Sequence, residues 1–138
     1  MKKLGLALAI VLTVAACGGD SGTTTTAAPG GAVSLSITLE DYLYAPESLT
    51  VAPGASVSLS ADNVGGTDHT WTLLTAGEEV TTAVDLDPAR VVAEVYVAAS
   101  SGASGLFTAP SQGGIYQVIC TVAGHMELGM VGSLVVSG

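Results

Sequence analysis

Strict alternation of apolar and polar residues is the feature that most limits how this chain can fold. In the stretch Val33-Ser-Leu-Ser-Ile-Thr-Leu39, every second residue is apolar and the residues between them carry hydroxyl groups. The stretch from Ser56 to Ala61 repeats the pattern, with Val57 and Leu59 on the apolar face. A period of two matches the β-strand, whose successive side chains point to opposite faces. Both stretches are therefore predicted to be half-buried strands.

Further short apolar runs follow at regular spacing, with turn residues between them. They predict strands at Leu49–Val51, Thr70–Leu74, Val91–Val97, Gly102–Ala109, Ile115–Thr121 and Met130–Val136. Residues 75–90 are polar and acidic, and we expect a long loop there that can hold a helical turn. Many short strands and no convincing helix favour an all-β fold, a Greek-key antiparallel β-sandwich or barrel that occupies residues 33–138.

The first 32 residues differ in composition from this predicted domain. Two lysines precede an apolar run from Leu4 to Ala16, an arrangement typical of a signal peptide and too short to span a bilayer. The run ends in Val-Ala-Ala-Cys17, which resembles the lipobox of bacterial lipoproteins. The resemblance implies removal of residues 1–16 and acylation of Cys17, whereas secretion with cleavage nearby is the alternative. Residues 17–32 contain no large apolar side chain and are predicted to be a flexible tether.

A lipid on Cys17 would hold the domain at a membrane surface without spanning the membrane. The expected location is therefore extracytoplasmic, on the periplasmic face or on the outer face of the cytoplasmic membrane.

The chain is strongly acidic. It has 12 Asp and Glu residues against 3 Lys and Arg residues, a formal net charge of −9. Loss of the predicted signal peptide removes both lysines and leaves Arg90 as the sole basic side chain. Such a surface disfavours nucleic acid and anionic lipid headgroups and favours a basic partner. The simpler interpretation is that the charge keeps an exported protein soluble.

A cluster of soft donor residues lies near the C-terminus. Cys120, His125 and Met130 follow one another with the spacing C-x4-H-x4-M, and the only other histidine is His69. The period-two phase places His69, Cys120 and Met130 on the core-facing sides of their strands, and His125 in a loop between two strands. With Cys17 acylated, Cys120 lacks a disulfide partner, and metal binding would explain it. Two imidazoles, a thiolate and a weak thioether are the ligands of a mononuclear blue-copper site.

Each of these residues also has an ordinary structural interpretation, because a lone buried cysteine is commonly a small hydrophobic residue. Zinc could occupy the same cavity, although it more often takes further thiolates or histidines. Magnesium and calcium are disfavoured because the cluster offers only one carboxylate, Glu127. A second methionine, Met126, directly follows His125 and is expected to point outward, which leaves Met130 as the thioether.

The segment Gly114–Val136 resembles the C-terminal signature of the cupredoxins, and is closest to the plastocyanin, azurin and auracyanin group. Further similarity lies at Tyr44–Gly54, between Asn63 and His69, and at Phe107–Pro110. The resemblance covers about residues 33–137. It implies a Greek-key β-sandwich that binds one type 1 copper, with three equatorial ligands and one axial ligand. The equatorial ligands are His69, Cys120 and His125, and the axial ligand is Met130.

One position departs from the family pattern. The residue after the first histidine is often asparagine in cupredoxins, and here it is Thr70. Its hydroxyl or backbone can still support the cysteine loop.

The resemblance implies an electron carrier. A site whose ligands all come from the protein has no open position for a substrate, and the sequence shows no catalytic base or second metal cluster, which argues against an enzyme. We expect a monomer that docks redox proteins, such as a c-type cytochrome or a membrane oxidoreductase, at the small apolar loop around His125. A module for copper delivery or sequestration is the alternative, and a metal-free β-sandwich adhesion module is a third interpretation.

Overall fold

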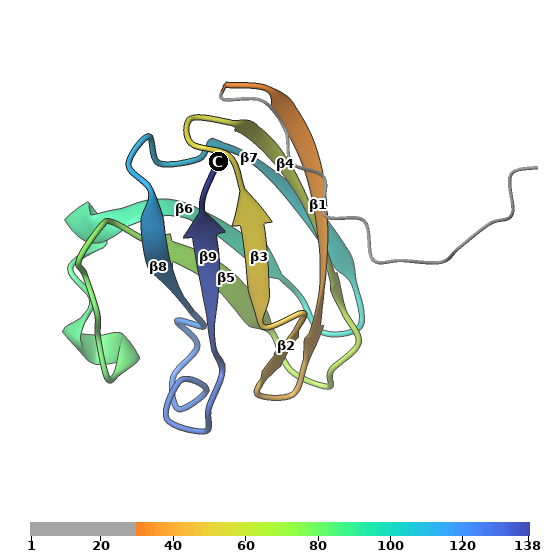
Figure 1. The fold of residues 1–138 in the computed structure, drawn as a ribbon. Helices are drawn as coiled ribbons and strands as arrows, with labels where there is room; N and C mark the ends of the chain where they lie inside the picture. The colour runs from red at the N-terminus through yellow and green to blue at the C-terminus, as the bar shows by residue number, and fades with distance from the viewer. Residues whose placement is uncertain (1–29) are drawn as a thin grey trace, which may run out of the picture.

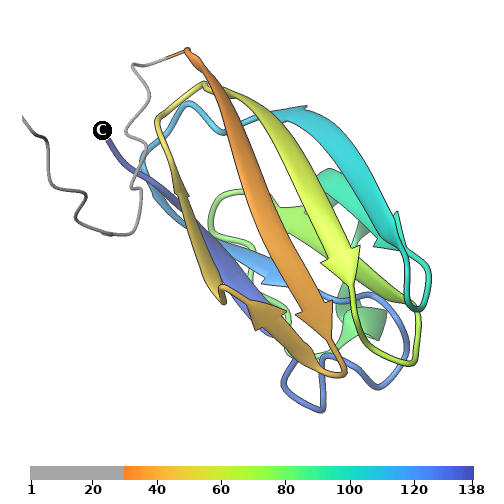
Figure 2. The same cartoon turned by 90° about the vertical axis from the view of Figure 1, so that its right-hand side faces the viewer.

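The computed structural model describes residues 30–138, which form two β-sheets packed face to face (Figures 1 and 2). One sheet has the strand order β2-β1-β4-β7 and the other the order β3-β9-β8-β5-β6. The bounds of the strands are β1 Ala32–Glu40, β2 Leu43–Ala45, β3 Ser48–Val51, β4 Ser56–Asn63, β5 His69–Leu74, β6 Val91–Val97, β7 Gly102–Thr108, β8 Gly114–Ile119 and β9 Val131–Val136. The predicted all-β sandwich is confirmed. The predicted signal peptide and Cys17 lie outside the described residues.

Two of the strand pairs are parallel, so both sheets are mixed. β1 pairs with β4 in parallel from Ala32↔Ser56 to Leu39↔Asn63, and β3 pairs with β9 in parallel. The other pairs are antiparallel. Parallel neighbours need a crossover connection rather than a tight hairpin. Between β1 and β4 the chain supplies it by running through β2 and then through β3 in the opposite sheet.

The apolar faces predicted from alternation form the central core. β4 alternates exposed and buried residues along its whole length, with Val57, Leu59 and Ala61 buried. The two sheets meet in contacts such as that between Trp71 on β5 and Phe107 on β7, whose ring centroids are 5.5 Å apart. The core therefore fixes the relative position of the sheets, and with it the position of every strand end.

Residues 75–90 cross the outer face of the larger sheet. They contain two short 3-10 helices, Ala83–Asp85 and Pro88–Arg90, which agrees with the predicted loop with a helical turn. Val80 from this segment joins a second, smaller apolar cluster with Leu74, Ile119 and Met126. The larger sheet is thus covered on both faces at its centre. No helix within residues 30–138 is long and apolar enough to cross a membrane.

Several loops meet at one end of the sandwich. The β1–β2 turn, the β4–β5 loop and the β8–β9 loop lie at the lower end in Figure 1, and the C-terminus lies at the opposite end. Contacts between loops confirm the arrangement, because the Asp41 carboxylate accepts a hydrogen bond from the Gly66 amide at 3.0 Å. This end holds the predicted ligands.

Candidate metal centre

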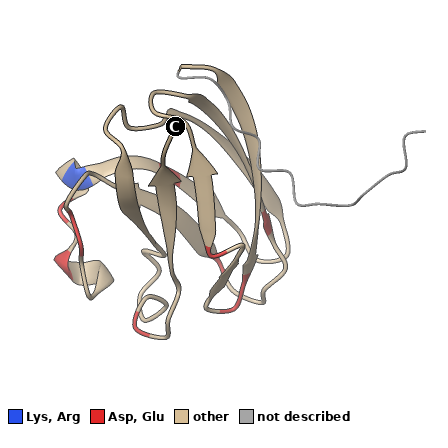
Figure 3. Cartoon of the chain, viewed as in Figure 1, with Lys and Arg blue, Asp and Glu red and all other residues tan. Residues whose placement is uncertain are grey.

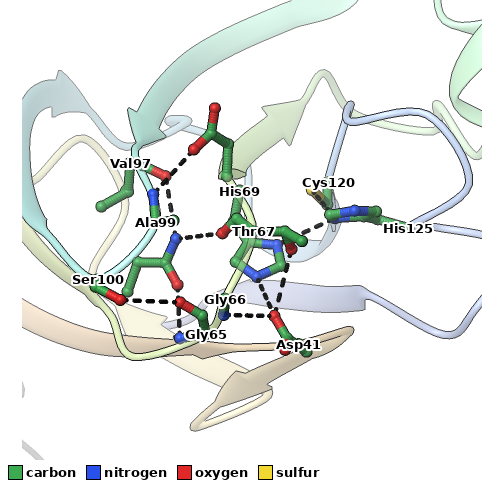
Figure 4. A network of polar contacts seen from close by, with 12 residues as sticks. Asp41, Gly65, Gly66, Thr67, His69, Val97, Ala99, Ser100, Cys120 and His125 are labelled. Atoms are coloured by element: carbon green, nitrogen blue, oxygen red, sulfur yellow. Dashed lines mark hydrogen bonds and ion pairs between the residues drawn. The ribbon is translucent and has the colours of Figure 1, made fainter.

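Three of the four predicted ligands converge in the folded chain. The Nδ1 atom of His125 lies 3.1 Å from Nδ1 of His69 and 3.6 Å from Sγ of Cys120. All three donor atoms lie within 4.8 Å of one another (Figure 4). His69 and Cys120 are 0% exposed and His125 is 7% exposed. The three residues therefore form a buried cluster of nitrogen and sulfur donors.

Two neighbouring strands position His69 and Cys120. His69 is the first residue of β5, and Cys120 directly follows β8. These strands pair at Leu73↔Val118 and Thr72↔Ile119. Nearer the site the ladder gives way to bonds that involve side chains. The Thr70 amide donates to Cys120 Sγ at 3.4 Å, and the Thr121 amide donates to Thr70 Oγ1 at 2.8 Å. The expectation that Thr70 supports the cysteine loop is confirmed for both its hydroxyl and its backbone.

The β8–β9 loop holds His125 through a series of tight turns. The His125 amide donates to the Val122 carbonyl at 3.1 Å, and the His125 carbonyl accepts from the Met130 amide at 3.0 Å. The Cys120 amide closes the base of the loop with the Met130 carbonyl at 3.3 Å. Gly124 and Gly129 have φ values of 84° and 103°, which favour glycine at both positions. The loop therefore has a defined shape without the metal.

The two methionines of the loop occupy different environments. Met130 is fully buried in the central core cluster that also contains Cys120. Met126 belongs to the second cluster, with Val80 and Ile119, on the outer face of the sheet. The prediction that Met126 points outward needs a correction, because its side chain is only 6% exposed. It points away from the central core, and the segment 75–90 covers it.

His69 contacts a carboxylate through its second ring nitrogen. Its Nε2 atom lies 3.5 Å from Asp41 Oδ1 without a hydrogen bond between them, and Asp41 Oδ1 accepts hydrogen bonds from Gly66 and Thr67. Burial lowers the pKa of His69, and the nearby His125 adds to this effect, while Asp41 opposes it. A lowered pKa favours the neutral imidazole, the form that binds a metal. A Cβ atom on Gly65 would lie 2.5 Å from Asp41 Oδ1, 3.0 Å from His69 Nε2 and 3.1 Å from the Asp41 backbone nitrogen, so a side chain here would displace the Asp41 carboxylate and crowd His69.

The donor set fits a soft, first-row ion. Metal–imidazole distances are about 2.0–2.1 Å and metal–thiolate distances about 2.3 Å. Nitrogens 3.1 Å apart, with a sulfur 3.6 Å from one of them, can therefore all bind one ion. A thiolate and two imidazoles suit copper better than harder ions.

Comparison with known proteins agrees with this chemistry. The model of the copper-binding proteins of the plastocyanin/azurin family matches residues 31–137. The chain belongs to the plastocyanin/azurin family of copper-binding proteins. It is a cupredoxin, and its cofactor is one type 1 copper.

Solved structures show the same cupredoxin fold. Auracyanin A, a blue copper protein from Chloroflexus aurantiacus, is 30% identical with a TM-score of 0.68, and the match covers 78% of this chain and 100% of that chain. Dithionite-reduced auracyanin from Roseiflexus castenholzii is 21% identical with a TM-score of 0.68, covering 79% of this chain and 100% of that chain. Reduced rusticyanin is 21% identical with a TM-score of 0.53, covering 82% of this chain and 89% of that chain. A comparison with curated protein sequences gave no match.

Sequence reasoning missed several polar residues around the site of this cupredoxin. Asp41 lies in the β1–β2 turn, next to His69, and Glu94 lies on β6, where it accepts a hydrogen bond from Thr72 at 2.8 Å. Neither residue has a distinctive neighbourhood in the sequence. Their roles depend on strand register, which places Thr72 directly opposite Glu94.

Proposed function

We propose that this protein is an extracytoplasmic electron carrier in which His69, Cys120 and His125 bind one copper ion, with Met130 as a weak fourth ligand. The observation that carries the proposal is the convergence of three buried soft donors within 4.8 Å. When bound, copper supplies a Cu(I)/Cu(II) couple that transfers one electron at a time. Membership of the plastocyanin/azurin family supports the same function.

The protein contributes a donor set that is held in place. His69 and Cys120 lie at the ends of paired strands, and the loop of His125 is closed by backbone hydrogen bonds. Donors fixed in this way change little in position when the charge of the ion changes, which suits rapid electron transfer. The Thr70 amide donates to the Cys120 sulfur and favours its thiolate form.

Enclosure of the donors supports a carrier rather than an enzyme. A catalytic metal site keeps a position open for water or substrate. Here two donor residues are fully buried and the third is nearly so. The same enclosure favours a resident ion over a cargo that is delivered to another protein.

The surface next to His125 is the proposed docking site for redox proteins. The Tyr42 ring meets the His125 imidazole edge-on, with ring centroids 5.1 Å apart. Tyr42, Val64 and Leu128, on the loops at this end, and Leu43, at the start of β2, are exposed large hydrophobic side chains. Weak redox encounters bury little area, so a small apolar surface is sufficient.

Charge suggests the chemistry of the partner. In Figure 3 acidic positions are spread over the chain and include the β8–β9 loop, whereas the one blue position lies in the 75–90 segment. That position is Arg90, the only basic side chain among residues 30–138. A partner with basic residues around its redox centre, such as a c-type cytochrome or a membrane oxidoreductase, would be attracted over a long range. We propose that the carrier is a monomer tethered to the membrane by a lipid on Cys17.

The test compares the two cysteines of the full-length chain. In the copper-loaded protein, we expect intense thiolate-to-copper absorption and a type 1 EPR spectrum, both lost in Cys120→Ser. The matched control Cys17→Ser should keep both signals but move from the membrane fraction to the soluble fraction. Retention of the absorption in Cys120→Ser would reject the site, and a membrane-bound Cys17→Ser would reject the anchor.

Two further measurements separate the carrier from its alternatives. Reversible one-electron voltammetry and rapid electron exchange with a c-type cytochrome are expected of the carrier. Copper that a mild chelator removes quickly would instead indicate delivery or sequestration. A wild-type protein that forms no coloured copper complex would indicate a metal-free adhesion module.

A further inference from the structure

An exposed carboxylate on β6 is connected to the interior of the metal centre through hydroxyl groups. Glu94 and Thr72 are paired directly across β6 and β5, so their side chains lie on the same face of the sheet. Glu94 Oε2 accepts from Thr72 Oγ1 at 2.8 Å. Thr72 Oγ1 lies 3.1 Å from Thr70 Oγ1, which lies 3.0 Å from Thr121 Oγ1. Thr121 Oγ1 in turn lies 3.5 Å from Glu94 Oε2. The four side chains therefore form a ring of contacts that joins the exposed carboxylate to the residue after Cys120.

The ionised carboxylate determines which way each hydroxyl points. A threonine hydroxyl has one proton to donate, and an ionised carboxylate can only accept. Thr72 therefore donates to Glu94 and cannot also donate to Thr70. Thr70 must then donate to Thr72, and Thr121 must donate to Thr70. In the opposite direction, Thr72 would donate to Thr70, Thr70 to Thr121 and Thr121 to Glu94. That direction leaves the 2.8 Å contact between Thr72 and Glu94 without a proton and relies on the 3.5 Å contact instead, so the shorter bond to the carboxylate decides against it.

The direction in which these hydroxyl groups donate affects how the cysteine loop is held. With its proton given to Thr72, the Thr70 hydroxyl presents its lone pairs to Thr121, whose backbone amide it accepts at 2.8 Å. A chain of hydrogen bonds that ends on a charged acceptor is polarised along its length, which strengthens each member. The peptide unit between Cys120 and Thr121 is thus fixed by a bond whose strength depends on Glu94.

The opposite side of Thr70 acts on the sulfur directly. The Thr70 amide donates to Cys120 Sγ at 3.4 Å, and the Thr70 carbonyl accepts from the Tyr44 hydroxyl at 2.5 Å. Thr70 is therefore fixed at its amide, its carbonyl and its side chain. A change in its side-chain hydrogen bond is therefore expected to move the amide that contacts the Cys120 sulfur.

We propose that Glu94 and Thr72 are positioning residues for the thiolate of Cys120: the carboxylate orients a chain of hydroxyl hydrogen bonds that fixes Thr70 and, through Thr121, the backbone of the cysteine. The proposal rests on the proposed role of Cys120 as a copper ligand. Its structural part can be tested in the metal-free protein, where copper binding has no influence on the result.

The first experiment measures amide hydrogen exchange in the metal-free protein. Glu94→Ala is expected to speed exchange of the Thr121 amide roughly fivefold, because its hydrogen bond loses the polarised acceptor. Glu79→Ala, which removes another exposed carboxylate, in the 75–90 segment, should leave that rate unchanged. Amides of β1 and β4 in the opposite sheet should be unaffected in both variants. An unchanged Thr121 rate in Glu94→Ala would overturn the proposal.

A double-mutant cycle tests whether the effect passes through Thr72. Thr72→Val removes the hydroxyl that links Glu94 to Thr70 while keeping the side-chain shape. If the chain operates, Glu94→Ala adds nothing to the exchange rate once Thr72→Val is present. Additive effects would show that Glu94 acts instead through its direct 3.5 Å contact with the Thr121 hydroxyl, and would refute the relay through Thr72. Glu94→Gln keeps an acceptor oxygen, so exchange of the Thr121 amide should be nearly as slow as in the wild-type protein. Exchange as fast as in Glu94→Ala would also refute the relay.

The copper-loaded protein supplies an independent readout. The thiolate-to-copper absorption and the reduction potential should shift in Glu94→Ala by more than in Glu79→Ala. Equal shifts in the two variants would mean that only charge acts, and would reject positioning of the thiolate. If the wild-type protein shows no thiolate-to-copper absorption, the proposed function fails, and the exchange rates in the metal-free protein still decide the hydrogen-bond chain.

Discussion

The Nδ1 atoms of His69 and His125 lie 3.1 Å apart, although 56 positions separate the two residues in the chain. Two unprotonated ring nitrogens facing each other at this distance would repel unless a positive charge or a shared proton lay between them. In the metal-free protein a proton on one ring can fill that role. If copper binds both Nδ1 atoms, that proton must move to Nε2 of the same ring, so binding of the ion is expected to change the tautomer of one histidine.

The same contact predicts how the stability of the metal-free protein depends on pH. Burial, and then the neighbouring His125, lower the pKa of His69 below its ordinary value of 6.5. Below that value the unfolded chain binds more protons at this residue than the folded chain does. The corresponding stability is present above pH 6.5 and is lost as the pH falls through the lowered pKa.

Urea unfolding of the metal-free protein at several pH values between about 5 and 8 measures this dependence. His69→Gln should reduce the slope of the free energy of unfolding against pH, since it removes the titrating group. A free energy of unfolding that rises as the pH falls below 6 would contradict the prediction.

The assignment of the axial ligand predicts different outcomes for two similar substitutions. Met130→Leu removes the thioether from the core cluster that contains Cys120, whereas Met126→Leu changes only the second cluster. Both swaps conserve volume and should cost less than about 1.5 kcal/mol of stability. Only Met130→Leu is expected to raise the reduction potential, because the axial donor tunes it. Voltammetry that finds the wild-type potential in Met130→Leu would show that the axial assignment is wrong.

Close approach of the backbone to His69 makes Gly65 sensitive to substitution. A methyl group in Gly65→Ala would collide with Asp41 Oδ1 and crowd His69 Nε2. We expect a loss of about 1–3 kcal/mol and weaker copper binding, as for an overpacked site. Gly66→Ala is the matched control, since its Cβ would meet only Asp41 Oδ2, at an ordinary 3.8 Å. Thermal unfolding and copper titration of both variants test this prediction. Equal unfolding temperatures and equal copper affinities in the two variants would show that a side chain at Gly65 does not crowd His69.

A hydrogen bond between the sheets contributes to stability at the metal-binding end. The Tyr44 hydroxyl, on β2, donates to the Thr70 carbonyl on β5 and is buried. Tyr44→Phe leaves that buried carbonyl without this donor, which should cost about 1–3 kcal/mol. Tyr116→Phe removes a bond to the Gln112 carbonyl that is only partly buried, and should cost less. Denaturant unfolding that ranks the two variants in the opposite order would refute the argument.

Local pattern predicted most of the fold. Alternation in β1 and β4 assigned the buried faces correctly, because one side chain in two must enter the core. The phase argument also placed His69 and Cys120 on core-facing sides, and both are fully buried. β2 was not predicted, since three residues are too few to show a period. The parallel pairing of β1 with β4 depends on how the chain crosses between sheets, which no single stretch reveals.

The surroundings of the site were harder to predict. Thr70 was expected to support the cysteine loop because of its position next to His69. Glu94 contacts Thr72 across 22 positions because strand register pairs them, and Asp41 contacts His69 across 28 positions because the β1–β2 turn packs beside the start of β5. Burial of Met126 depends on Val80, in a segment whose sequence has no clear periodicity. Local patterns identify the donors, whereas tertiary pairing selects the residues that hold them.

The small exposed fraction of His125 has a consequence for how the ion enters. His69 and Cys120 are sealed from solvent and His125 is 7% exposed, so we expect an incoming ion to enter past His125. Rotation of that ring would admit the ion without separating the sheets. Uptake and escape would then be governed by a single side-chain motion within a hydrogen-bonded loop, and each ion should stay in place over many rounds of oxidation and reduction.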